Sequence, residues 1–147
     1  MVQVQVTEAS EYMERVAGVL GGDGSLHLEL SISSVDEAKL AHKRMVQQQK
    51  QLRQIKKEIN QDMKNIRAAY KEASDNVQPS ASSSIFGGLF GKKGYAKGNV
   101  AQQRRDLRQR RDGTLEPYNQ AKLTIDDLLI QMDGAKLSIK NYIDEES

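Results

Sequence analysis

The fold is decided by residues 35–77, which read VDEAKLAHKRMVQQQKQLRQIKKEINQDMKNIRAAYKEASDNV. Apolar side chains recur in this stretch almost always in steps of three or four residues, which places them on one narrow face of a long helix. The stripe consists of Val35, Ala38, Ala41, Met45, Leu52, Ile55, Ile59, Met63, Ile66, Tyr70, Ala73 and Val77. A face of this width is typical of a helix that packs lengthwise against a second helix.

The start of this helix has a clear signal in the sequence. Ser34 and Glu37 form a capping box, in which the Ser34 hydroxyl accepts a hydrogen bond from the Glu37 amide and the Glu37 carboxylate reaches back. Helix-forming residues occupy the outer positions, and no Gly or Pro interrupts them. We therefore expect a helix over residues 34–77, which ends before Pro79.

A second apolar stripe with similar spacing appears further along the chain. Its members are Leu107, Thr114, Tyr118, Ala121, Ile125, Leu128, Met132, Ala135, Ile139 and Tyr142. Asn99 is a suitable N-terminal cap for this second helix, which we expect over residues 99–143. Pro117 lies inside it, and we expect a kink there because proline has no amide hydrogen and crowds the preceding turn.

Residues 78–98 are rich in serine and glycine, and this composition predicts a loop at the apex between the two helices. Two apolar stripes joined by one loop predict a mainly α protein. We expect residues 34–147 to form a long antiparallel helical hairpin, coiled-coil-like, whose two arms meet along their apolar faces.

Charge is distributed unevenly along the chain, although the net charge is only +2. Residues 39–57 carry seven Lys or Arg and no acid, whereas residues 116–133 are acidic. A hairpin that turns near residue 87 sets these stretches side by side, with Met45 near Leu129. Flanking pairs of opposite charge set the orientation and register of coiled coils.

Residues 1–33 are expected to form a small β-containing N-terminal cap. Apolar and polar residues alternate at 2–6 and at 26–32, which predicts two half-buried strands. Between them, we expect Thr7 to cap a short helix that Gly21 helps to end. Two strands alone are marginal in water, so we expect them to pack on the helices or to pair with strands of a second copy.

The composition argues against a thick core, since hydrophobic residues make up 37% of the chain and aromatic residues 5%. The absence of cysteine fits a reducing compartment. No apolar run approaches the roughly 18–20 residues of a membrane span, and the N-terminus lacks the features of a secretory signal. We therefore expect a cytoplasmic protein.

The apex combines basic and apolar residues, and it is the strongest candidate for a specific contact. Side chains of these two kinds dock on anionic membrane surfaces, which predicts a protein peripheral to the membrane. Alternatively, the dense basic helix at residues 104–111 predicts non-specific contact with nucleic-acid phosphates. The candidate interaction residues are Phe86, Leu89, Phe90, Lys92, Lys93, Tyr95, Arg104, Arg105, Arg108, Arg110 and Arg111.

No set of residues in the chain indicates a reaction. The two histidines, His27 and His42, have no i, i+4 partner for a metal ion, and the glycines near Lys92 lack the spacing of a phosphate-binding loop. We expect no enzyme activity, metal, cofactor or small-molecule substrate. The expected function is that of a structural or protein-interaction module, which self-associates or binds a protein partner because a two-helix seam buries only a strip of each helix.

Overall fold

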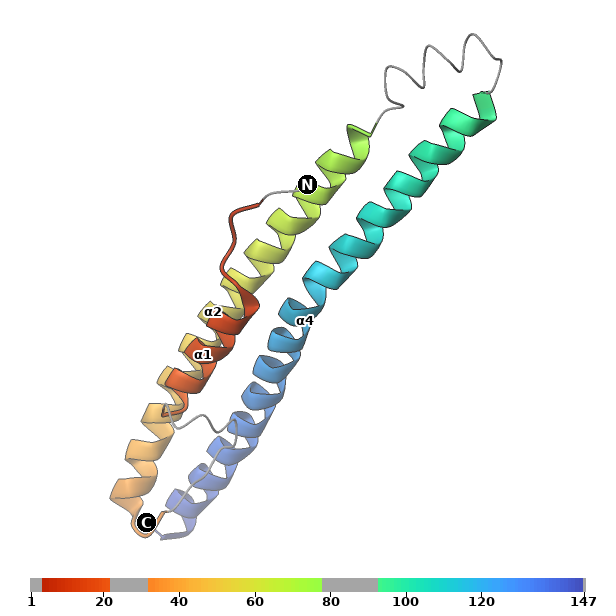
Figure 1. Ribbon diagram of the computed structural model, residues 1–147. Helices are drawn as coiled ribbons and strands as arrows, with labels where there is room; N and C mark the ends of the chain where they lie inside the picture. The colour runs from red at the N-terminus through yellow and green to blue at the C-terminus, as the bar shows by residue number, and fades with distance from the viewer. Residues whose placement is uncertain (1–3, 22–31, 78–92, 147) are drawn as a thin grey trace. The chain divides into compact units, whose positions relative to one another are not determined.

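The computed structural model describes residues 4–21, 32–77 and 93–146. All regular elements in these three ranges are α-helices (Figure 1). They are α1 (Ala9–Val19), α2 (Val35–Asp75) and α4 (Lys93–Glu146). The expected mainly α class is confirmed.

The chain divides into two compact units. Unit 1 comprises Met1–Val6 and Asp62–Glu116, and unit 2 comprises Thr7–Gln61 and Pro117–Ser147. Both α2 and α4 therefore contribute one segment to each unit, whereas α1 belongs to unit 2 alone.

Unit 2 is built around an apolar core to which all three helices contribute. Full burial of an aliphatic or aromatic side chain contributes about 1.5–3 kcal/mol, so this core is the main source of the unit's stability. Most of its members occupy positions that the apolar spacing predicts. Those at most 6% exposed are Tyr12, Val16, Ala38, Met45, Leu52, Ile55, Ile59, Tyr118, Ala121, Ile125, Leu128, Met132 and Ile139.

Polar contacts and an aromatic pair hold α1 within unit 2. The Tyr118 hydroxyl donates a hydrogen bond to the Thr7 carbonyl at 2.7 Å. The rings of Tyr12 and Tyr118 meet edge to face, with their centroids 6.4 Å apart. At the other end of α1, the Gln48 side chain donates to the Val19 carbonyl at 3.0 Å. Both ends of this short helix are thus tied to a long one.

The segments of α2 and α4 in unit 2 run antiparallel. Lys56 Nζ bonds to Asp126 Oδ1 at 2.5 Å, and Gln49 Nε2 bonds to Asp133 Oδ1 at 2.8 Å. Moving from Lys56 back to Gln49 along α2 therefore means moving forward along α4. These pairs join the basic stretch of α2 to the acidic stretch of α4.

The register of this pairing differs from the expected one. Met45 packs in one cluster with Ile139, whereas a turn centred on residue 87 placed it near Leu129. The expected register was wrong because a long loop closes at almost any offset, at an entropic cost that changes slowly with length. The fit of core side chains between the helices sets the register instead.

Unit 1 pairs the other segments of α2 and α4 around a smaller core. The Tyr70 hydroxyl lies 3.2 Å from the Thr114 hydroxyl, which joins the two helices by a hydrogen bond. Thr114 also donates to the Arg110 carbonyl at 2.7 Å within α4. The apolar side chains of unit 1 that are buried in the described ranges are Met63, Ile66 and Leu115.

The end of α2 is capped from α4 within unit 1. The last turn of α2 carries no basic residue, and its terminal carbonyls favour a nearby positive charge. Arg104 supplies this charge, because its Nε donates to the Ser74 carbonyl at 3.4 Å. The pairing of Ser74 with Arg104 and of Tyr70 with Thr114 makes these segments antiparallel as well.

The start of α2 follows the capping box in part. The Glu37 amide donates to the Ser34 hydroxyl at 3.1 Å, as expected. The Glu37 carboxylate accepts from the amide and the hydroxyl of Ser33, at 2.9 and 2.8 Å, one residue before the cap. These two hydrogen bonds hold the pKa of Glu37 below its usual value, because they stabilise the carboxylate.

Two expected helix starts are wrong. Helix α4 begins at Lys93, so residues 93–98 belong to a helix and Asn99 lies inside it. Glycine lowers helix stability by only about 1 kcal/mol, and adding a turn to an existing helix needs no new nucleus. At α1, the N-cap residue is Glu8, whose side chain makes no capping bond, so Thr7 is not the cap.

The expected β-containing cap is not found in the described residues. Residues 4–6 form no strand, which agrees with the weakness of a strand that has no partner. Most of the second expected strand, residues 26–31, lies outside the described ranges. Ile32 is in no strand and packs against the core formed by Ala38, Met45 and Ile139.

Pro117 lies inside α4, which is assigned as one helix from Lys93 to Glu146. Proline cannot donate to the carbonyl of Gly113, four residues earlier, so the helical ladder has a gap there. The kink expected at this point stays a prediction.

Candidate interaction surfaces

The candidate apex residues fall into two groups. Phe86, Leu89, Phe90 and Lys92 lie outside the described ranges, so the membrane contact expected from them stays a prediction. Lys93 and Tyr95 belong to the first turn of α4. The five candidate arginines are all described, and all lie on the part of α4 that belongs to unit 1.

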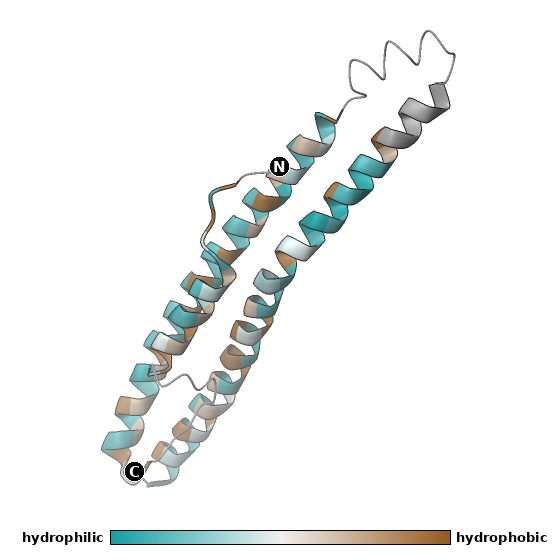
Figure 2. Cartoon of the chain, viewed as in Figure 1, coloured by the Kyte–Doolittle hydropathy of each residue, from teal (hydrophilic) through white to brown (hydrophobic). Residues whose placement is uncertain are grey.

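The arginines of α4 form a polar surface that is largely open to water. Arg104, Arg105, Arg108 and Arg110 are exposed, whereas Arg111 is half-buried. Figure 2 shows this part of α4 mostly in the colour of hydrophilic residues. The spacing of positions 104, 105, 108 and 111 puts them on one side of the helix, and position 110 lies away from them.

Two of these arginines already have structural partners. Arg104 donates to the Ser74 carbonyl at the end of α2, and Arg111 forms an ion pair with Asp112 at 3.0 Å. Arg105, Arg108 and Arg110 form no ion pair with any other described residue. The one acid among them, Asp106, accepts a hydrogen bond from Gln102 at 3.0 Å. Three guanidinium groups are thus available for an outside partner.

The outer face of α4 in unit 2 carries a feature that the sequence analysis missed. Leu123, Ile130 and Leu137 are 61%, 70% and 61% exposed, although they are large and apolar. Their spacing of seven residues corresponds to two helical turns, so they form one row along the helix, here called the outer row. Gly134 lies between two of them, and a Cβ added there would meet nothing within 4 Å.

The outer row could have been found in the sequence. Leu123, Ile130 and Leu137 are among the large apolar residues that the inner stripe of α4 leaves out, and they repeat with the heptad period. Assigning one stripe to each helix concealed this second repeat. A helix with apolar rows on two faces has a surface to bury beyond its own core.

Gln49 is the second feature that the sequence analysis missed, since it is only 1% exposed. Its Nε2 donates to Asp133 Oδ1 at 2.8 Å and to the Leu129 carbonyl at 3.4 Å, and its Oε1 accepts from Lys136 Nζ at 2.9 Å. A buried amide with these partners fixes the alignment of two helices, since a slip would leave it unpaired. The seven-residue gap in the stripe between Met45 and Leu52 is the signal for it.

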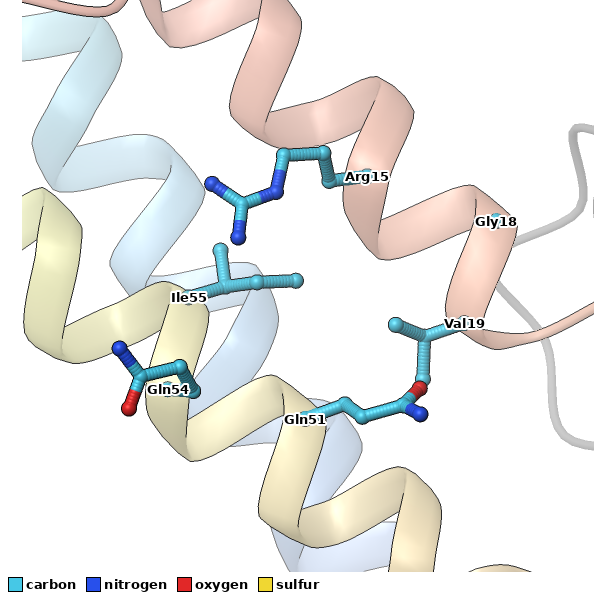
Figure 3. Close-up of a pocket in the computed structure, with 6 residues that line it drawn as sticks. All are labelled: Arg15, Gly18, Val19, Gln51, Gln54 and Ile55. Atoms are coloured by element: carbon cyan, nitrogen blue, oxygen red, sulfur yellow. The ribbon is translucent and has the colours of Figure 1, made fainter.

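A shallow pocket of about 360 Å³ lies in unit 2, with lining residues from α1 and α2 (Figure 3). Arg15 is engaged at its edge, because the guanidinium bonds to Glu58 at 2.7 Å and lies 5.6 Å from the centre of the Tyr12 ring. The bond to Glu58 raises the pKa of Arg15 above its usual value. The lining residues are Arg15, Gly18, Val19, Gln51, Gln54 and Ile55.

The chemistry of this pocket is limited to packing and amide hydrogen bonds. Ile55 and Val19 offer apolar surface, and Gln51 and Gln54 offer carboxamides. None of the lining side chains is a nucleophile, and none can act as a general base near neutral pH. The pocket suits a small apolar group better than a reacting substrate.

Across the ranges that the structure describes, no cluster of three or more His, Asp or Glu residues is arranged to hold a metal ion. None of the helices in these ranges combines the length and apolarity needed to cross a bilayer. Comparisons with protein-family models, with curated proteins and with solved structures gave no match. Function is therefore inferred from the surfaces described above.

Proposed function

We propose that the chain is a non-enzymatic helical interaction module, which self-associates through the outer row. The exposure of Leu123, Ile130 and Leu137 is the observation that carries this proposal. Large apolar side chains that repeat every seven residues form the seam of coiled coils, in which each copy covers the row of the other. Burial of the row on association would remove this apolar surface from water.

A second copy of the chain is the partner that fits this row best. In a parallel pair with a two-fold axis along the helices, Leu123, Ile130 and Leu137 each meet the same residue of the other copy. In a parallel pair, Lys122 of one copy comes near Asp127 of the other, which gives two attractive contacts. In an antiparallel pair centred on Ile130, Lys122 would come closer to Lys136, which disfavours that orientation.

The expected association is weak and depends on concentration. A stable interface buries about 800 Å² on each partner, and three side chains supply only a part of this area. Flanking residues of α4 must therefore contribute polar contacts around the apolar row. An equilibrium of this kind suits an assembly that forms and dissociates readily.

Light-scattering mass across a concentration series tests this proposal. Ile130→Glu places a charge at the centre of the row, and it should yield a monomer where the unmodified chain is dimeric. Ser138→Glu is the matched control, because Ser138 is also exposed on α4 in unit 2 but lies outside the row. A monomeric unmodified chain, or equal effects of the two substitutions, would reject self-association through this row.

We also propose that α2 and α4 form one long antiparallel hairpin. Antiparallel contacts within unit 1 and, separately, within unit 2 support this arrangement. Spin labels on exposed positions provide a test, since a hairpin requires short distances both between positions 71 and 108 and between positions 39 and 140. A long distance in either pair would contradict a continuous hairpin.

A further inference from the structure

Charge is partitioned between the two units. Unit 1 contains eleven Lys and Arg against six Asp and Glu, a net charge of +5, whereas unit 2 contains eleven against fourteen, a net charge of −3. The small net charge of the whole chain conceals this division. Unit 1 is therefore the part of the molecule that attracts polyanions, within the Debye length of about 8–10 Å near physiological salt.

The positive charge of unit 1 is available at its surface. Arg105 and Arg108, one turn apart on α4, are exposed and have no ion-pair partner among the described residues. The α2 segment of the same unit adds a row of exposed basic residues, spaced by three and four positions along one helical face. That row consists of Lys64, Arg67 and Lys71.

The side chains favour nucleic acid over a lipid surface. Arginine forms paired hydrogen bonds with phosphate oxygens, and it supplies all five basic residues of positions 104–111. Peripheral membrane binding also requires apolar side chains that insert. The apolar residues of unit 1 that could insert, Phe86, Leu89 and Phe90, lie outside the described ranges, so binding to anionic vesicles is one outcome of the test below.

We propose that unit 1 binds the phosphate backbone of double-stranded nucleic acid through a surface centred on Arg105 and Arg108, beyond the interaction function proposed above. The contacts go to phosphates and carry no sequence information. Each phosphate contact releases counterions, so the affinity falls steeply as the salt concentration rises. A basic helix of this kind holds a self-associating module on a nucleic-acid strand without selecting a site.

Fluorescence anisotropy of a labelled short duplex, titrated with the full chain at several salt concentrations, tests this proposal. Arg105→Gln combined with Arg108→Gln should weaken binding at low salt by about tenfold or more and lower the salt slope by about 0.9 for each phosphate that is no longer neutralised. Arg44→Gln combined with Arg53→Gln is the matched control, because both residues are exposed on α2 in unit 2 and the charge change is identical. The control should bind like the unmodified chain.

Three results would overturn the proposal. They are absence of duplex binding at low salt, equal weakening in the two double variants, and binding to vesicles of anionic lipid without binding to the duplex. Far-ultraviolet circular dichroism should show the same helicity in all three chains, since every substituted residue is exposed. This test does not use the light-scattering mass of the unmodified chain or of the Ile130→Glu variant. Duplex binding by unit 1 and self-association through the outer row can therefore be rejected independently.

Discussion

Unit 1 and unit 2 use the same two long helices but differ in what they bury and what they expose. In the described residues, thirteen apolar side chains of unit 2 are buried, compared with three in unit 1. Unit 2 also has a third helix, α1, and the bonded Gln49 in its core. Packing of α1 against the two long helices thus gives unit 2 a larger apolar core than unit 1 has. Unit 1, which buries fewer apolar side chains, carries the excess positive charge.

The largest effect should come from placing a charge in the core of unit 2. Leu128 is 1% exposed, so Leu128→Asp should lower the free energy of unfolding by about 3–5 kcal/mol, as an unpaired buried charge does. The same change at Ile130, two residues away and 70% exposed, should alter it by less than about 0.5 kcal/mol in dilute monomer. Urea denaturation measures both values. Similar losses in the two variants would contradict the assignment of inner and outer faces.

Substitutions that create a cavity at equally buried isoleucines should destabilise the two units to different extents. Ile125 in unit 2 and Ile66 in unit 1 are both 0% exposed. Ile125→Ala should cost about 3–4 kcal/mol, and Ile66→Ala about 2 kcal/mol, because a two-helix seam can close over the space more easily than a three-helix core. Hydrogen exchange across each helix gives the local values. Equal losses would remove the difference in packing that distinguishes the units.

A smaller loss of stability is expected when the hydrogen bond that attaches the start of α1 to α4 is removed. Tyr118→Phe removes the hydrogen bond to the Thr7 carbonyl and leaves the ring against Tyr12, so it should cost about 1 kcal/mol. The loss should appear first as faster amide exchange in residues 9–19. Unchanged exchange in α1, together with a loss elsewhere, would show that this bond does not hold the helix.

The smallest effect should be the change with pH in the stability of the first turn of α2. The pKa of Glu37 is lowered by its bonds to Ser33, so its stabilising contribution is present above its usual pKa of about 4.5 and is lost as the pH falls through the lower value of the folded state. Glu37→Gln should abolish this dependence. Amide exchange at residues 34–38 between pH 5 and pH 3 measures it, and an identical profile in the variant would disprove the role of the carboxylate.

Spacing alone predicted most of the packing, because a buried helical face requires apolar residues every three or four positions. Leu52, Ile59, Ile125 and Met132 were all assigned to the inner faces on this basis, and all are buried. Gln49 was not predicted, since its burial depends on acceptors and donors that lie about 80 positions away in the chain. The gap in the stripe between Met45 and Leu52 marks an inner position, but it does not show which partners would satisfy a buried polar group there.

The ends of the helices and the register between α2 and α4 were harder to predict from the sequence. Gly94 and Gly98 favoured a loop, yet a helix that is already formed extends through them at modest cost. The packing of Met45 with Ile139, where Leu129 was expected, shows the same limit, because the offset of two helices depends on how their side chains fit. Among the candidate site residues, the arginines could be recognised as a dense basic run. That Arg105, Arg108 and Arg110 form no ion pair with the other described residues became clear only from the structure.

Disulfide formation between single-cysteine chains tests self-association through the outer row most directly. The chain contains no cysteine, so Ile130→Cys introduces one thiol at the centre of the row, and Arg53→Cys introduces one at an exposed site of α2 in the same unit. If the row is the contact, Ile130→Cys should form a covalent dimer about ten times faster or more under mild oxidation, because association raises the effective thiol concentration. Equal rates for the two variants would contradict self-association through this face.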